Sequence, residues 1–306
     1  MNNRATFYDI ENMCQLHFDK LEGIYHLCAP ENHPIIFRSK EELASGMNFM
    51  GIAAKAHRQI RLMTFELMSN HIHAIVVGGK SDMSDFFNCF KKLVARNLHI
   101  KDLTGFTMQL HTIATLENLR NAIAYANRNG SVIDNNVCPY TYPWGANMYF
   151  FNPQAQKRYN EQKSKATIRE IREITRSRKF DQIDDLYLVD GYICPMSFCF
   201  ITDGERMFRD ARHYFTKISR HIESYDEIAK MIGEQVYYTD DDLFSIACTI
   251  STQKYDCRIP SLLEKDDKIA LAKFLNHKYN AGIKQLRRIL KIDMSLLQAL
   301  FGSSPT

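Results

Sequence analysis

Two histidines stand one residue apart at the start of an apolar, β-branched stretch of the sequence. His71 and His73 flank Ile72 and lead into the sequence Ala-Ile-Val-Val of residues 74–77. Because side chains at positions i and i+2 of a strand point to the same face, a strand here presents both imidazoles together. Imidazole is the commonest metal ligand in proteins. The pattern predicts a bidentate metal platform, and the alternative is a pair of surface or hydrogen-bonded histidines on a hairpin.

A helix is predicted about fifty residues later, with Thr115 as its N-cap and Gly130 just after its end. Its apolar side chains recur at helical spacing, at Leu116, Leu119, Ile123 and Ala126. Tyr125 and Asn129 are four residues apart and therefore share one face of this helix. The alternatives are that Tyr125 packs in the core and that Asn129 is an ordinary residue near a helix end.

A phenol that lies beside a metal ion bound by two histidines and an amide could attack a phosphodiester. A divalent cation, Mg²⁺ or Mn²⁺, bound by His71, His73 and Asn129 would polarise the phosphate oxygens, and the Tyr125 oxygen would be the nucleophile. Tyr142 and Tyr149 are the nearest rival tyrosines, but they lie outside the predicted helix. No dedicated base for the tyrosine is evident in the sequence.

These blocks and their order resemble the REP-associated tyrosine transposases, a branch of the single-tyrosine HUH transposases. The family's Met-Pro-Asn-His-x-His block is matched by residues 68–73, Met-Ser-Asn-His-Ile-His. Its Tyr-x-x-x-Asn-Pro helix end is matched by residues 125–130, and its Trp-Ser-Ser-Tyr-like block by residues 142–149. A Tyr-His pair in the family's first strand is matched by Tyr25 and His26. The resemblance covers about residues 20–152.

Four positions depart from the family pattern: Ser69 and Gly130 replace prolines, and the serines after Trp144 are replaced by Gly145 and Ala146. None of these changes removes a proposed ligand or the nucleophile. His26 could touch DNA or lie behind the metal, or it could be a buried structural histidine. Trp144 could stack on a base, as aromatic side chains do in single-strand binders, or it could serve packing.

The predicted elements of residues 1–152 alternate between strands and helices. The strands are expected at 23–29, 60–68, 71–77 and 106–113, and the helices at 40–59, 84–98 and 115–130. This order predicts an α+β fold with a ferredoxin-like antiparallel sheet and flanking helices, which is also the HUH-type fold that the resemblance implies.

The chain length of 306 residues predicts two domains. Residues 1–152 form the predicted HUH-type nuclease domain, 153–185 a basic linker, and 186–306 a helical domain. The eight cysteines are scattered, no signal peptide is evident and no apolar run is long enough to span a membrane. These features predict a cytoplasmic, nucleoid-associated protein with reduced cysteines and no membrane partner.

Basic side chains are concentrated in the predicted linker, where Lys157 to Lys179 include nine Lys or Arg and three acids. They could form a phosphate-binding strip or merely the solvated face of a helix near residues 167–177. The candidate DNA-binding residues here are Lys157, Arg158, Lys163, Lys165, Arg169, Arg172, Arg176 and Arg178.

The C-terminal region is predicted to be helical, with helices beginning near Phe208, Tyr225, Asp240 and Asp266. Residues 281–301 could form a helix-turn-helix, with the first helix ending near Leu290 and Ser295 capping a short, uncharged second helix. An ordinary helical hairpin fits equally well. Lys284, Arg287 and Arg288 on the first helix could contact phosphates.

The leading hypothesis is a transposase-like enzyme that cleaves and joins single-stranded or hairpin DNA through a 5′-phosphotyrosine intermediate. It needs a divalent metal and no organic cofactor, and it acts as a monomer or homodimer. The alternatives are a non-catalytic regulator that binds DNA hairpins, and a metal phosphodiesterase without a covalent intermediate.

Overall fold

The computed structural model describes residues 7–29, 35–133, 139–219, 238, 240–279 and 281–301. The chain divides into two compact units. The first comprises Met1–Ser131 and Asn136–Arg220, and the second comprises Val132–Asn135 and His221–Thr306. The first unit therefore includes residues 153–185, for which the sequence predicts a linker, and it continues to the end of α8 (Ala211–Ile218).

A four-stranded antiparallel sheet is the centre of the first unit. Its strands are β1 (Ile24–Ala29), β2 (Arg61–Leu67), β3 (Ile72–Val77) and β4 (Gln109–Thr112), in the order β2-β3-β1-β4. Every residue of β3 is buried, as are most of those in β1 and β2. Such continuous burial requires that both faces of the sheet be covered.

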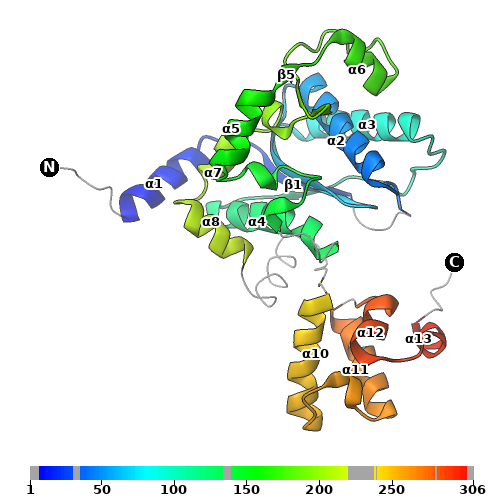
Figure 1. Cartoon of the computed structure of the whole chain (residues 1–306). Helices are drawn as coiled ribbons and strands as arrows, with labels where there is room; N and C mark the ends of the chain where they lie inside the picture. Colours follow the sequence, from blue (N-terminus) through cyan, green and yellow to red (C-terminus); the bar gives the residue numbers. More distant parts are fainter. Residues whose placement is uncertain are drawn as a thin grey trace. The chain divides into compact units, whose positions relative to one another are not determined.

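Helices cover the two faces of this sheet (Figure 1). Helices α2 (Lys40–Ala56) and α3 (Lys80–Asn97) pack together on one side, and α4 (Leu116–Ile133) lies on the other. The α2 helix begins where the Ser39 side chain accepts a hydrogen bond from the Glu42 amide. The α+β architecture expected from the sequence is thus present, with all four predicted strands and all three predicted helices of this region.

Helix α4 begins as predicted but ends later. The Thr115 hydroxyl accepts a hydrogen bond from the Asn118 amide, so Thr115 is the N-cap. The helix then continues past Gly130 to Ile133, and the prediction that Gly130 follows its end was wrong. A glycine inside a helix costs only about 1 kcal/mol relative to alanine, so a single one does not force termination.

Five further helices and a small sheet complete the first unit around α4 and β2. They are α1 (Phe7–Phe18), α5 (Pro153–Gln162), α6 (Ile168–Thr175) and α7 (Ile201–Glu205), with α8, and a three-stranded sheet of β5 (Ser164–Lys165), β6 (Tyr187–Val189) and β7 (Tyr192–Ile193). Three single-turn 3₁₀ helices lie at Pro139–Thr141, Asn147–Tyr149 and Pro195–Ser197.

The described residues of the second unit are helical, as expected. They form α10 (Asp240–Tyr255), α11 (Lys265–Tyr279), α12 (Ile283–Leu290) and α13 (Met294–Phe301), with a 3₁₀ turn at Pro260–Leu262. The helix expected from Tyr225 lies outside the described residues. Ser295 does not cap α13 as predicted: its amide and hydroxyl both donate to the Asp293 carboxylate, so the acidic side chain occupies the capping position.

None of the helices in the described part of the chain combines the length and apolar character that a membrane span requires.

Candidate active site

The two histidines of the His-x-His pattern lie together at the start of β3. Their ring centroids are 5.2 Å apart with the planes 83° from parallel, and the residues are only 3% and 2% exposed. The tight link before β3 is closed by the Met68 amide, which donates to the His71 carbonyl oxygen. The strand therefore presents both imidazoles on one face of the sheet, as the spacing predicts.

Both imidazoles make a hydrogen bond through Nδ1, and this is compatible with a proton on that nitrogen. His71 Nδ1 lies 2.9 Å from the Asn70 amide oxygen, which can only accept, so Nδ1 is the protonated nitrogen. His73 Nδ1 lies 3.1 Å from His26 Nε2 and can donate to it in the same way. In this arrangement each imidazole of the pair carries its lone pair on Nε2, the nitrogen that would bind a metal.

Tyr125 is placed by α4 against this pair. The centroid of its ring lies 5.4 Å from that of His73 and 6.1 Å from that of His26, and both contacts are edge-on. The residue is 2% exposed. The fold thus places Tyr125, the predicted nucleophile, beside histidines that are about fifty residues away in the sequence. In this position Tyr125 is shielded from solvent.

Asn129, the third predicted ligand, is buried one turn further along α4. Its amide nitrogen donates to the Tyr125 carbonyl oxygen at 3.1 Å. This bond orients the side chain back along its own helix. Asn129 therefore shares a face with Tyr125, as predicted.

Helix α4 is locked to the sheet by a buried polar network two residues from Tyr125. The Thr64 hydroxyl donates to the Asn127 amide oxygen, and the Asn127 amide nitrogen donates to the Tyr214 hydroxyl at 2.8 Å. Tyr214 in turn donates to the Asn147 side chain at 2.5 Å, and Asn147 donates to the Asn127 carbonyl at 2.8 Å. Because these side chains satisfy one another in a dry interior, they fix the position of α4 on β2.

Strand pairing adds residues that the sequence motifs did not single out. Glu66 on β2 is fully buried and directly opposite His73. His111 on β4 is directly opposite His26, and their rings stack with centroids 6.1 Å apart. The sequence signal for Glu66 is a glutamate inside a strand of apolar residues. The signal for His111 is a histidine in a short polar strand. Neither can be tied to His73 or His26 without knowing the strand order.

Burial lowers the pKa of His26, His73 and His111 and so favours the neutral form of these three imidazoles. Burial, and to a smaller extent the charge of His111, lowers the pKa of His26 to about 3. Burial also lowers the pKa of His73 well below its usual value, and the neighbouring His26 and His71 act in the same direction. The pKa of His111 is lowered by burial. Neutral imidazoles are the form that ligates metals.

Among the residues that the structure describes, no group of three or more His, Cys, Asp and Glu side chains is arranged to hold a metal ion. The histidine pair and the Asn129 amide remain the ligands predicted from the sequence, and the hydrogen bond of the Asn129 side chain goes to the carbonyl of Tyr125 on its own helix.

The predicted basic strip is largely engaged in interactions within the first unit. Ion pairs join Arg158 to Asp190, Arg169 to Glu173, and Arg172 to Asp181, at 2.6, 2.9 and 2.5 Å, and a longer one of 3.7 Å joins Lys157 to Glu161. The other members have different surroundings. Arg176 contacts His99 and Lys163 lies over the rings of Tyr159 and Tyr187, whereas Lys165 and Arg178 are exposed and make no ion pair with the described residues.

In the second unit, α12 and α13 pack against each other in the place of the predicted helix-turn-helix. Lys284 and Arg287 of α12 are exposed, and Arg288 is paired with Asp240 at the start of α10. The second helix, α13, carries no charged side chain. Both the helix-turn-helix and the helical-hairpin interpretations accommodate these contacts.

Comparison with known proteins gives this chain no relative: no protein-family model, no curated protein and no solved structure matches it.

Proposed function

We propose that this protein is a metal-dependent enzyme that cleaves and joins single-stranded or hairpin DNA, in the manner of the REP-associated tyrosine transposases that its motifs resemble. The observation that carries the proposal is the position of Tyr125, whose ring lies 5.4 Å from that of His73 and beside the His71–His73 pair. These residues come from segments about fifty positions apart, and the fold places them side by side.

The arrangement of the sheet supports a finer proposal about the fold. The first six elements around the sheet follow the order β1-α2-β2-β3-α3-β4, and the strands are antiparallel in the order β2-β3-β1-β4. We propose that this order is the split βαβ plan of a ferredoxin-like fold. We propose that it serves as an HUH-type nuclease scaffold, with β3 carrying the histidines and α4 carrying the tyrosine.

Mg²⁺ or Mn²⁺ would be held by His71 and His73, with the Asn129 amide oxygen as a third ligand. The donor set is compatible with a cation, because burial lowers the pKa of His73 well below its usual value and a proton on Nδ1 of each ring would leave Nε2 to the metal, with the Asn129 oxygen as the ligand type that Mg²⁺ and Mn²⁺ prefer. When bound, the cation would offset the negative charge that the phosphate gathers during the reaction. His26 would orient His73 through the 3.1 Å hydrogen bond to its Nδ1.

In the proposed step the Tyr125 oxygen attacks phosphorus in line with the bond to the 3′-oxygen. A bond from oxygen to phosphorus forms, the bond to the 3′-oxygen breaks, and the phenol proton passes to water while the leaving oxygen takes up a proton. The products are a 5′-phosphotyrosine and a free 3′-hydroxyl. Attack by another 3′-hydroxyl reverses the step and joins a new strand.

The burial of Tyr125 imposes a condition on this reaction. At 2% exposure its hydroxyl cannot meet a phosphate unless α4 moves away from β3 or its side chain turns outward. The same burial favours the alternative of a metal phosphodiesterase in which water, and no tyrosine, attacks. The two functions differ in whether a covalent adduct forms.

The decisive experiment uses end-labelled hairpin DNA, the full chain and Mn²⁺, followed by a denaturing gel. We expect an SDS-stable protein–DNA band for the wild type and none for Tyr125→Phe, because the substitution removes the attacking oxygen and preserves the ring. Tyr142→Phe serves as the matched control and should retain the band.

Mass spectrometry should place the nucleotide on the peptide that contains Tyr125. An adduct on Tyr142 or Tyr149 would keep the enzyme class and overturn the residue assignment. Cleavage without any adduct would establish the hydrolytic alternative, and a DNA mobility shift without cleavage would establish a binding regulator.

A further inference from the structure

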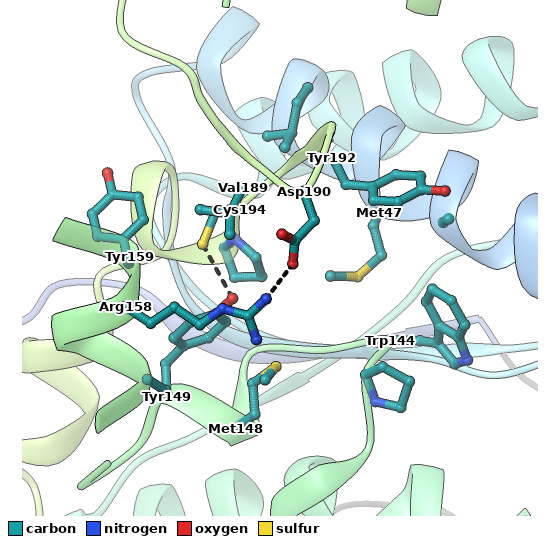
Figure 2. Close-up of a pocket in the computed structure, with 15 residues that line it drawn as sticks. Met47, Trp144, Met148, Tyr149, Arg158, Tyr159, Val189, Asp190, Tyr192 and Cys194 are labelled. Atoms are coloured by element: carbon teal, nitrogen blue, oxygen red, sulfur yellow. Dashed lines mark hydrogen bonds and ion pairs between the residues drawn. The ribbon is translucent and has the colours of Figure 1, made fainter. Parts of the chain in front are cut away.

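A cavity of about 290 Å³ opens between α2, α5, the β6–β7 hairpin and the segment that follows Tyr142 (Figure 2). Its walls are rich in flat side chains, with Trp144, Tyr149, Tyr159 and Tyr192 all lining it together with Met47 and Met148. The cavity is separate from the histidine pair, since none of its lining residues belongs to the candidate active site. A cavity of this size with aromatic walls suits one flat heterocycle better than an extended chain.

One ion pair supplies the hydrogen-bonding groups of this cavity. An Arg158 guanidinium nitrogen lies 2.6 Å from an Asp190 carboxylate oxygen, and Figure 2 shows this pair between the Tyr149 and Trp144 walls. Both side chains are more than half exposed, at 56% and 63%. An exposed ion pair contributes little stability, so its two members can exchange part of their contact for a ligand at small cost.

The backbone holds the acidic member of the pair in a fixed place. Asp190 and Gly191 form the two-residue turn between β6 and β7, and their φ angles are 52° and 81°. Such a turn requires left-handed backbone at both central positions and is among the commonest hairpin connections. Asp190 therefore presents its carboxylate from a defined position, and an asparagine could replace it without strain.

We propose that this cavity binds a guanine base. Guanine offers the O6 and N7 acceptors to a guanidinium, and its N1 and N2 hydrogens to a carboxylate. No other DNA base combines two acceptors on one edge with two adjacent donors. The aromatic side chains would stack on the faces of the guanine base, and Arg158 and Asp190 would form hydrogen bonds with its edge.

The guanine would come from the single strand on which the enzyme acts, and to that extent the inference rests on the proposed function. The Trp144 carbonyl accepts a hydrogen bond of 2.8 Å from Leu67, and Gly145 forms a β-bridge to Glu66, the residue opposite His73. The segment that carries the tryptophan is thus attached to the edge of the strand that flanks the histidines. A free guanine nucleotide would present the same chemistry, and the experiment separates the two sources.

The test exploits the fact that Trp144 is the only tryptophan in the chain. The full chain, without metal, is titrated with dGMP, dAMP, dCMP and dTMP while the tryptophan fluorescence is recorded. We expect saturable quenching by dGMP at concentrations at least about tenfold lower than for the other three, from the lost hydrogen bonds of the wrong base. Oligothymidine with one internal guanine, compared with the same strand bearing adenine, identifies the strand as the source if it binds more tightly than dGMP. Binding of dGMP alone identifies a free nucleotide.

Two variants test the edge contacts. Asp190→Asn and Arg158→Gln should each weaken dGMP binding about tenfold and change dAMP binding little. Arg169→Gln is the matched control, because it breaks an exposed ion pair of the same kind on α6, away from the cavity. Circular dichroism verifies that each variant is folded.

Equal quenching by all four nucleotides would overturn the proposal, as would full dGMP affinity in both edge variants. Because the titration needs neither metal nor cleavage, its result is independent of Tyr125. An adduct without guanine binding would refute the cavity alone, and guanine binding without an adduct would refute the phosphotyrosine mechanism alone.

Discussion

At the scale of single residues, the histidines show how burial sets chemical state. His26 is fully buried and its pKa is lowered to about 3, mainly by desolvation. An unfolded histidine titrates near pH 6.5. The unfolded chain therefore binds more protons than the folded chain between these two values, and folding is penalised as the pH falls through that window.

We accordingly expect the free energy of unfolding to decrease as the pH falls below 6.5, by about 1.4 kcal/mol per pH unit for His26 alone. His73, whose pKa is also lowered, should steepen the decrease. Urea denaturation between pH 7 and pH 5 measures the slope.

His26→Gln is the informative variant for this effect. It keeps a side chain that can accept the hydrogen bond from His73 and removes one titrating group. Its slope should be smaller by about one proton, and an unchanged slope would show that His26 is not responsible.

At the scale of elements, the position of Tyr125 depends on how α4 is held. Asn127 makes three hydrogen bonds to Thr64, Tyr214 and Asn147, and all four residues are buried. Asn127→Ala would remove a hydrogen-bond partner from Thr64 and from Tyr214, at a cost of about 1–3 kcal/mol for each, whereas the bond from Asn147 goes to the Asn127 backbone carbonyl and remains. We expect a loss of about 2–4 kcal/mol in the free energy of unfolding, measured by urea denaturation.

Asn118→Ala on the same helix provides the control for that measurement. Asn118 is half-exposed near the start of α4, so its replacement should change stability by less than about 0.5 kcal/mol. If both variants were equally stable, the network would not be what fixes α4. If Asn127→Ala folded and still formed the adduct at an increased rate, the network would be a brake on the movement that exposes Tyr125.

At the scale of the whole molecule, the division of the chain determines which fragments can fold. Tyr214 belongs to α8 and completes the network around Asn127, although it lies beyond the predicted nuclease domain. A fragment of residues 1–220 should therefore unfold in one cooperative transition and retain the chemistry of Tyr125.

A fragment that ends at Ala155 lacks α7, α8 and the β6–β7 hairpin, and it should be much less stable because the buried partners of these elements become exposed. Thermal unfolding followed by circular dichroism compares the two fragments. Equal midpoints would show that residues 156–220 add nothing to the first unit. Loss of binding selectivity in the 1–220 fragment, with cleavage retained, would assign recognition to the second unit.

The sequence by itself determined the local structure around the candidate site. Sequence patterns predicted the four strands and three of the four α-helices of the first 152 residues, and α1 was not predicted. The helices show a period of 3.6 because one face of each is buried, whereas strands such as β3 are buried on both faces and were recognised as apolar, β-branched runs. The i, i+2 spacing of His71 and His73 and the i, i+4 spacing of Tyr125 and Asn129 likewise predicted shared faces, since such spacings are properties of a single element.

Only the tertiary structure decided how these elements meet. Strand order placed Glu66 opposite His73 and His111 opposite His26, and packing buried Tyr125 against the histidines. It also drew residues 153–219 into the first unit and paired two cations of the basic strip with acids more distant in sequence, Arg158 with Asp190 and Arg172 with Asp181. These relations join residues that no periodicity connects, because they depend on long-range contacts whose free energy comes from burial in the assembled fold.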